Sequence, residues 1–167
     1  RHTLRSVISF AYRYDIGFVT YTGQRIYKNP TFKKIVLSFL QNADIGIDDI
    51  EVKMIKAKQK EASGDDPDDK ITYSIITKHN SKTNDSTTRE TMQMNINYES
   101  NGTVKLFGLI GPLMDVLENG YTLVYDELDT RLHPILTRLV VSLFNDHETN
   151  PNKAQLIFNT HDVNLLD

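Results

Sequence analysis

Apolar and polar residues alternate with different periods in successive parts of the chain, and each period predicts a different element. Residues 1–27 carry apolar and aromatic side chains in a partly alternating pattern, which predicts one or two irregular strands or loops. After Pro30 the apolar residues fall at helical spacing, and Asn29 is a suitable N-cap. This segment predicts a helix that ends near Asn42.

Three segments of period-two alternation follow, at residues 50–54, 71–78 and 90–98. This is the pattern of strands with one exposed face. Their connections, KEASGDDPDDK and HNSKTNDSTT, are polar and rich in turn-forming residues. The three strands therefore most simply form an antiparallel meander, accessory to the rest of the fold.

The pattern changes again from residue 100 onward. A wide apolar stripe between Gly102 and Asn119 predicts a buried helix, and Gly120 ends it. An apolar strand then leads to Asp126, a second helix begins at Pro134, and the apolar strand in AQLIFNTHD follows. The order helix, strand, helix, strand is typical of a parallel sheet, so the predicted fold class is α/β with parallel core strands.

Composition limits the classes of protein to which the chain can belong. Its 167 residues are 39% hydrophobic, enough for one domain with a core, and the lack of cysteine excludes disulfides and thiolate metal sites. The net charge of -3 argues against a surface built as a whole to bind nucleic acid, although it is compatible with a local basic patch. Nucleic acid is neither required nor excluded.

No apolar stretch approaches the roughly 20 residues that span a bilayer, and no signal-peptide pattern opens the chain. We therefore expect a soluble, cytoplasmic protein without a membrane partner. The sequence begins at Arg1 without an initiator methionine and stops at Asp167, soon after an apolar pair. It is expected to be a segment of a longer polypeptide.

Two adjacent carboxylates, Asp126 and Glu127, follow the apolar strand in YTLVYDELDTRLHP. Ligands of open α/β sheets bind beyond the carboxyl ends of buried parallel strands, so the pair lies where a binding site is expected. Nucleotide hydrolysis needs an acid that coordinates magnesium, a role for Asp126, and a base for the attacking water, a role for Glu127. The alternative interpretation is that the pair only caps the loop and the following helix.

The second apolar strand also ends in polar residues, Thr160, His161 and Asp162. If the two strands are parallel neighbours, these side chains and the acidic pair converge on one edge of the sheet. His161 could then donate to the γ-phosphate, whose negative charge needs donors during phosphoryl transfer. A histidine after a strand can instead serve only to anchor its loop.

The string ESNGT, residues 99–103, precedes the first helix of this region. Gly102 permits close approach of the backbone, and Ser100 with the free amides of the helix start would bind an anion. The same string is equally suited to a plain turn and N-cap.

Taken in order, YESNGTVKLFGLIGPLMDVLENGYTLVYDELDTRLHP and AQLIFNTHDVNLLD resemble the second half of an ABC-type ATPase head. The similarity is closest to ATPases associated with bacterial abortive infection and phage defence. These are related to the overcoming-lysogenisation-defect nucleases and to the structural-maintenance-of-chromosomes heads. The resemblance is dense over residues 98–167 and looser over NADIGIDDIEVK.

The resemblance assigns roles to the residues of the ESNGT string and of the acidic pair. It implies that Ser100, Asn101 and Gly102 form the signature motif, which contacts the γ-phosphate of ATP held by a second protomer. It also implies that Asp126 is the Walker B acid, binding magnesium through water, and that Glu127 is the catalytic base.

The resemblance further implies a D-loop at Leu128 and Asp129, at the seam of a dimer, and a switch role for His161 in reaching the γ-phosphate. The signature departs from the commoner Leu-Ser-Gly-Gly form, with Glu99 in the place of leucine. The chain also lacks GxxxxGK followed by Ser or Thr, the P-loop whose amides cradle phosphates. Either the P-loop lies upstream in the full protein or the domain is a degenerate ATPase.

The sequence thus predicts part of a P-loop NTPase head of the ABC type. Residues 1–98 would supply an accessory helix and antiparallel strands, and residues 99–167 the signature, Walker B, D-loop and switch-histidine subdomain. The predicted function is ATP binding and hydrolysis with Mg²⁺ in a dimeric switch of two heads that acts with an effector in anti-phage defence or abortive infection. The alternatives are an ATPase-like scaffold that acts through protein contacts and, ranked last, a metal-dependent nuclease.

Overall fold

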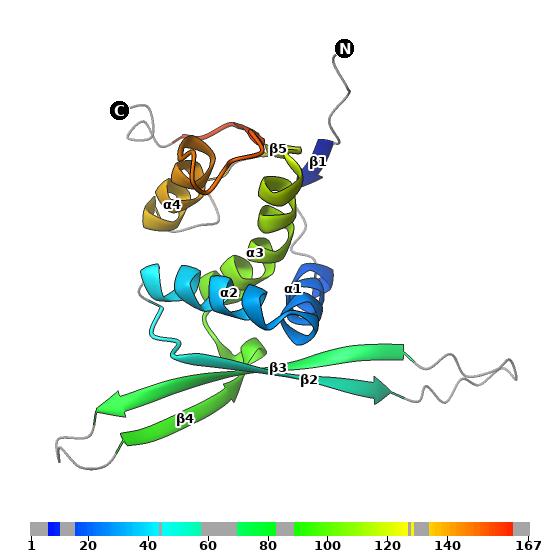
Figure 1. Ribbon diagram of the computed structural model, residues 1–167. Coiled ribbons are helices and arrows are strands. Elements are labelled where there is room, and N and C mark those ends of the chain that lie inside the picture. Colours follow the sequence, from blue (N-terminus) through cyan, green and yellow to red (C-terminus); the bar gives the residue numbers. More distant parts are fainter. Residues whose placement is uncertain are drawn as a thin grey trace, which may run out of the picture. The chain divides into compact units, whose positions relative to one another are not determined.

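The computed structural model describes residues 7–10, 16–43, 45–57, 70–82, 89–126, 128 and 134–161. The chain forms two compact units, one of Arg1–Val19 with Ser100–Asp167 and the other of Thr20–Glu99. Each unit has its own three-stranded sheet, one parallel and one antiparallel (Figure 1). The protein is therefore a mixed α/β structure, as predicted.

The first unit is built on a parallel sheet in the order β1 (Val7–Phe10), β5 (Thr122–Tyr125), β6 (Gln155–Phe158). The last residues of β5 and β6, Tyr125 and Phe158, are register partners. The two strands therefore end at the same edge of the sheet. This confirms the prediction that the two apolar strands after residue 120 are parallel neighbours.

Helix α3 (Asn101–Asn119) carries most of the apolar core of this unit. Ser100 caps its start, and Gly120 ends it in the left-handed conformation with φ of 64°. The side chains along its apolar stripe are fully or almost fully buried, among them Leu106, Phe107, Ile110, Leu113, Val116 and Leu117. Helix α4 (Pro134–Asn145) contacts β6, and both helices lie where the sequence predicts them.

The second unit contains β2 (Asp49–Ala57), β3 (Lys70–Lys82) and β4 (Arg89–Asn95) in antiparallel order, followed by the short 3₁₀ helix η1 (Ile96–Tyr98). The predicted meander is confirmed, although β3 continues beyond residue 78 and β4 ends before residue 98. Helix α2 (Pro30–Asn42) is also confirmed. Its N-cap Asn29 accepts hydrogen bonds from the backbone N–H groups of Thr31 and Phe32.

The prediction for residues 16–27 was wrong, because this segment is helix α1 (Ile16–Lys28) and not an irregular strand or loop. Aromatic and β-branched residues are common in strands, but packing can override such preferences. The buried positions Val19, Thr22, Gly23 and Ile26 recur at helical spacing. Within the second unit Gly23 packs so closely on β3 that a Cβ there would lie 2.7 Å from Cδ1 of Ile75.

None of the helices in the described part of the chain is both long enough and apolar enough to cross a membrane.

Candidate functional site

The candidate site of the first unit lies at the ends of β5 and β6. Asp126 follows β5, Asn159 follows β6, and both side chains are exposed. The side-chain amide of Asn159 donates a hydrogen bond from Nδ2 to Oδ1 of Asp126 over 2.8 Å. The backbone N–H of Leu128 donates to the carbonyl oxygen of Asn159 over 3.2 Å. The structure therefore joins the segments that follow the two strands.

Asn159 was not among the residues singled out from the sequence, although its neighbours Thr160 and His161 were. A signal for it exists in the sequence, because it directly follows an apolar strand just as Asp126 does. Parallel strands that end in register bring such residues side by side. Their pairing could therefore have been expected once the strands were taken as neighbours.

The other predicted residues of this edge are described only in part. His161 lies three residues beyond the end of β6, and its side chain is exposed. Glu127 and Asp129 lie outside the described residues. Leu128, between them, is completely buried.

The predicted anion-binding turn is the start of α3. Oγ of Ser100 accepts a hydrogen bond from the backbone N–H of Thr103 over 3.1 Å and lies 2.8 Å from Oγ1 of Thr103. Its carbonyl oxygen accepts from Val104 N–H. Ser100 is therefore a true N-cap, which confirms the structural interpretation of ESNGT and leaves its functional interpretation open.

Asn101 and Gly102 form the exposed first turn of this 19-residue helix. A Cβ at Gly102 would meet only Oγ of Ser100, at 3.8 Å, so packing within the protein does not require glycine here. The absence of a side chain leaves the backbone of the turn open to a ligand. The first N–H groups of a long helix favour an anion, because they lack intrahelical acceptors and lie at the positive end of the helix dipole.

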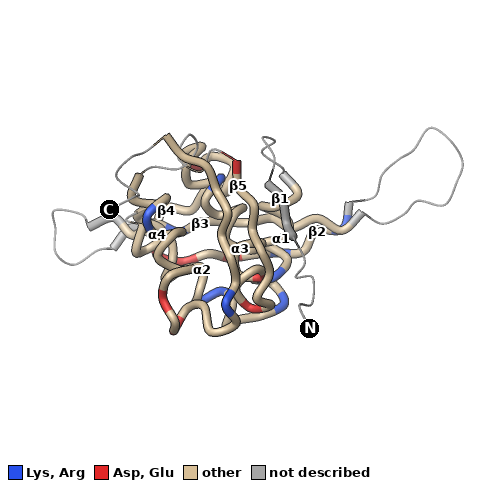
Figure 2. The backbone as a smooth tube through the Cα atoms, turned by 90° about the horizontal axis from the view of Figure 1, so that it is seen from above, with Lys and Arg blue, Asp and Glu red and all other residues tan. Residues whose placement is uncertain are grey.

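Charged side chains of α2, β2 and β3 form ion pairs with one another in the second unit. Asp49 binds Lys33 at 2.7 Å and Lys78 at 3.5 Å, while Glu51 binds Lys53 at 2.8 Å and Lys78 at 3.3 Å. Acidic and basic residues are likewise interspersed along the described backbone (Figure 2). Lys53 and Lys78 of this sheet are therefore paired with neighbouring carboxylates.

These ion pairs shift the protonation equilibria of their members. Burial raises the pKa of Asp49, but hydrogen bonds from Lys33 and the Ile50 amide, with the charges of Lys33 and Lys78, bring it below its ordinary value. Hydrogen bonds from Lys53 and Lys78, with their charges, lower the pKa of Glu51. The hydrogen bond to Glu51 and the neighbouring carboxylate charges raise the pKa of Lys78, although desolvation opposes this. The groups thus hold one another in their charged forms.

Glu99, which stands where the signature motif of the resembling ATPases commonly has leucine, has a structural role in the second unit. Its Oε1 accepts from the hydroxyl of Thr77 over 2.5 Å and lies 2.7 Å from Nε2 of His79. Nδ1 of His79 lies 2.8 Å from the carbonyl oxygen of Gly46 and must donate to it. The side chain of Glu99 is only 9% exposed, so this carboxylate is already engaged by protein groups.

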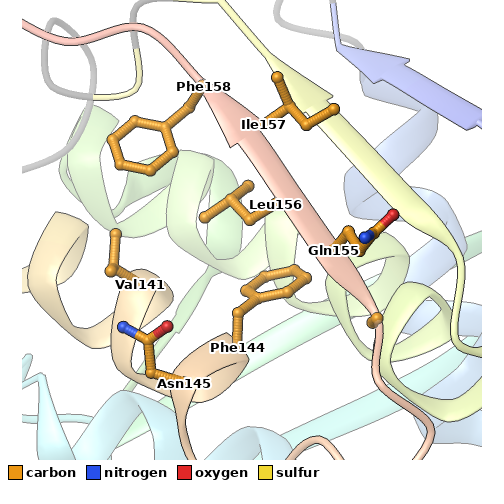
Figure 3. Close-up of a pocket in the computed structure, with 8 residues that line it drawn as sticks. Val141, Phe144, Asn145, Gln155, Leu156, Ile157 and Phe158 are labelled. Carbon is orange, nitrogen blue, oxygen red and sulfur yellow. The ribbon is translucent and has the colours of Figure 1, made fainter.

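A cavity of about 330 Å³ lies between α4 and β6. Figure 3 shows Val141 and Phe144 of α4 facing Leu156 and Phe158 of β6, while Ile157 points to the other face of the strand. Its lining is mostly apolar, with Asn145 and Gln155 as the polar side chains. No predicted site residue lines this cavity, and it has no charged group that would bind a phosphate.

Within the described residues no group of three or more His, Asp or Glu side chains is placed to hold a metal ion by itself. A cation at Asp126 would need further ligands from water, from a nucleotide or from residues outside the described ranges. This agrees with the way magnesium usually binds, through one or two carboxylates, substrate phosphates and several waters. Asp126, the carboxylate of this edge that the structure describes, therefore fits a magnesium–nucleotide site.

The comparisons with known proteins give one finding on the family of the chain. Residues 23–167 match the family model described as "AAA domain, putative AbiEii toxin, Type IV TA system". No characterised protein and no solved structure matches the chain. The matched residues include α2, α3 and every residue of the candidate site. They also include all strands of the two sheets except β1. The chain belongs to this family of AAA domains, and this membership indicates a nucleotide-binding, ATPase-like function.

Proposed function

We propose that the chain is the signature and Walker B half of an ABC-type ATPase head, which binds and hydrolyses ATP with Mg²⁺. The observation that supports this most strongly is the hydrogen bond between Asp126 and Asn159 at the ends of two parallel strands. Nucleotide ligands of α/β sheets bind at this edge. Membership of the AAA-domain family supports the same chemistry.

Asp126 is proposed as the acid that holds magnesium and Glu127 as the base that activates water. Asp126 is exposed and follows the strand directly, so its carboxylate can reach a ligand beyond the sheet edge. Magnesium, when bound, neutralises the charge that develops on the transferring phosphoryl group. Glu127 is the next residue, and a carboxylate there would accept the proton of the attacking water.

The start of α3 is proposed to bind the γ-phosphate of ATP held mainly by a second protomer. Ser100, Asn101 and Gly102 would present backbone amides and a hydroxyl to the phosphate. If the Thr103 hydroxyl donates within the Ser100–Thr103 pair, the Ser100 hydrogen is available for a phosphate oxygen. The open space above Gly102 gives the phosphate access to the backbone.

His161 and Asp129 are proposed to act at the dimer seam. His161 would donate to the γ-phosphate, and Asp129 would belong to the D-loop between two heads. Closure and opening of the pair would switch an effector in abortive infection or anti-phage defence, in line with the toxin–antitoxin description of the family. The P-loop that this scheme needs does not occur in the 167 residues, so it would come from elsewhere in the protein that carries them.

Replacement of Glu127 by Gln tests the proposed hydrolysis. Because glutamine keeps the size of the side chain but cannot accept the proton, turnover should fall by about 10² to 10⁴-fold while ATP binding is retained. The measurement is phosphate release together with equilibrium binding of ATP, made on the full protein. Unchanged hydrolysis in Glu127→Gln would refute the role of Glu127 as the base.

The missing P-loop string favours one second candidate, an ATPase-like scaffold that acts through protein contacts. Radiolabelled ATP and Mg²⁺ distinguish the two in the full protein. Saturable binding supports the ATPase, and its absence supports the scaffold.

A further inference from the structure

We infer that Asn159 is a positioning residue that orients the carboxylate of Asp126 for a divalent cation; this inference rests on the proposed function. Asn159 directly follows β6 and Asp126 directly follows β5, so their hydrogen bond of 2.8 Å links the ends of two separate strands. Of the predicted acids, Asp126 is the one whose side-chain orientation the structure describes. Its orientation is set from the neighbouring strand.

Asn159 is attached to the segment after β5 at two points. Its side-chain amide binds Asp126, and its backbone carbonyl accepts from the N–H of Leu128. Leu128 is completely buried, so the second attachment point is fixed in the core. A donor held in this way restricts the rotamers of an otherwise exposed aspartate. Restricting them in advance lowers the entropy cost of binding a ligand in that orientation.

The chemical type of the donor suits a cation site. An amide N–H is neutral, so it orients the carboxylate without cancelling its negative charge. A lysine or arginine in the same place would compete with the cation for that charge, as Lys33 and Lys78 would at Asp49. Hydrogen-bond partners that orient a metal-binding group commonly change metal affinity by about 10 to 100-fold when removed.

The β5–β6 pair contains a matched control at its other end. There the hydroxyl of Thr122 donates to Oε1 of Gln155 over 3.2 Å, which is also a side-chain hydrogen bond between the two strands. Gln155 is exposed like Asn159 but lies at the start of β6, away from Asp126. Asn159→Leu and Gln155→Leu therefore each remove a side-chain hydrogen bond between the β5 and β6 segments. Only Asn159→Leu removes a bond to the carboxylate of Asp126.

The experiment titrates Mg²⁺ into the full protein with a fluorescent ATP analogue and measures the Mg²⁺ concentration for half-maximal binding. Asn159→Leu should raise this concentration by about tenfold. Gln155→Leu should leave it within about twofold, because the Thr122 bond does not touch the site. Asn159→Gln, which keeps an amide donor on an exposed side chain, should restore most of the affinity. Melting temperatures identify any variant that is not folded, and Asn159→Ala replaces Asn159→Leu in that case.

The outcomes separate this inference from the proposed function. Normal Mg²⁺-dependent nucleotide binding by the wild type, with Asn159→Leu equal to Gln155→Leu, would overturn the role of Asn159 and leave the proposed function intact. A wild type that binds no nucleotide would overturn both. A tenfold loss in Asn159→Leu that Asn159→Gln reverses supports the inference.

Discussion

The carboxylates of the two units differ in the kind of partner that they have. In the second unit Asp49 and Glu51 are each bound by two lysines, and their pKa values are lowered. In the first unit the hydrogen bond described at Asp126 comes from the neutral amide of Asn159. Lysines beside a carboxylate offset its charge, whereas a neutral amide orients a carboxylate and leaves its charge for a cation.

The starts of helices α2 and α3 also differ, in how many of their first backbone N–H groups have a partner within the protein. Helix α2 begins with Asn29, whose side chain accepts from two N–H groups of the first turn, and with Pro30, which has no N–H. Helix α3 begins with Ser100, whose side chain accepts from one, and continues with an exposed asparagine and glycine. Helix α3 therefore leaves more of its first amides for a ligand. This difference supports the proposed phosphate site at α3 over a site at α2.

The largest expected effect comes from a negative charge at the start of α3. Gly102→Glu should lower ATP hydrolysis by about 100-fold, because a carboxylate next to a phosphate costs several kcal/mol. The free energy of unfolding should stay the same or rise by up to about 1 kcal/mol, because a Cβ meets open space there and an acidic residue suits a first helical turn. Phosphate release and urea denaturation measure the two quantities.

Thr31→Glu is the matched control for that substitution, since Thr31 is exposed in the first turn of α2. It adds the same charge at a helix start of the other unit and should leave hydrolysis within about twofold. An equal loss of activity in both variants would show that the effect is general electrostatic repulsion. It would remove α3 as the phosphate site.

A smaller effect, on stability, comes from two glycines that are packed differently. Gly120 has a φ of 64°, and a Cβ there would collide with the backbone carbonyl oxygen of Asn152, in the loop before β6. Gly120→Ala should therefore destabilise the protein by about 2 to 4 kcal/mol. At Gly23 a Cβ would collide with the Ile75 side chain, which can shift more readily than a backbone atom, and alanine favours a helix. Gly23→Ala should cost less than about 1 kcal/mol.

Thermal or urea denaturation of the two alanine variants checks this difference. Gly120 stands between α3 and β5, and the side chain of Asn152 donates to the carbonyls of Leu117 and Glu118 at the end of α3. If the Gly120→Ala and Gly23→Ala variants were equally stable, the close packing of Gly120 against Asn152 would be refuted.

The parts of the fold predicted from sequence are those specified by local signals. Asn29 and Pro30 mark the start of α2, Ser100 and Gly120 mark the two ends of α3, and apolar runs followed by polar residues mark β5 and β6. Such signals act within a few residues, so one sequence contains them in full. The convergence of the two strand ends followed from topology, because parallel neighbours end at one edge.

The features that were missed depend on contacts between distant residues. Helix α1 contains residues common in strands, and its helical form depends on packing such as that of Gly23 on Ile75. Strand β3 continues through turn-type residues because β4 pairs with them; the hydroxyl of Thr91 also donates to the side chain of Asn80. The link from Asn159 to Asp126 likewise spans two strands. A single sequence does not specify the partners of Gly23 and of β3, whereas the pairing of Asn159 with Asp126 can be expected once β5 and β6 are known to be parallel neighbours.

The role of Asp126 in binding the cation can be tested by counting the Mn²⁺ ions bound by the full protein. Electron paramagnetic resonance with and without ATP gives this count. If Asp126 holds the cation of a nucleotide complex, the wild type should bind about one Mn²⁺ per chain with ATP and much less without it. Asp126→Ala should weaken the ATP-dependent binding by at least about tenfold, and Asp49→Ala should not. Equal Mn²⁺ binding by the wild type and Asp126→Ala would contradict the account.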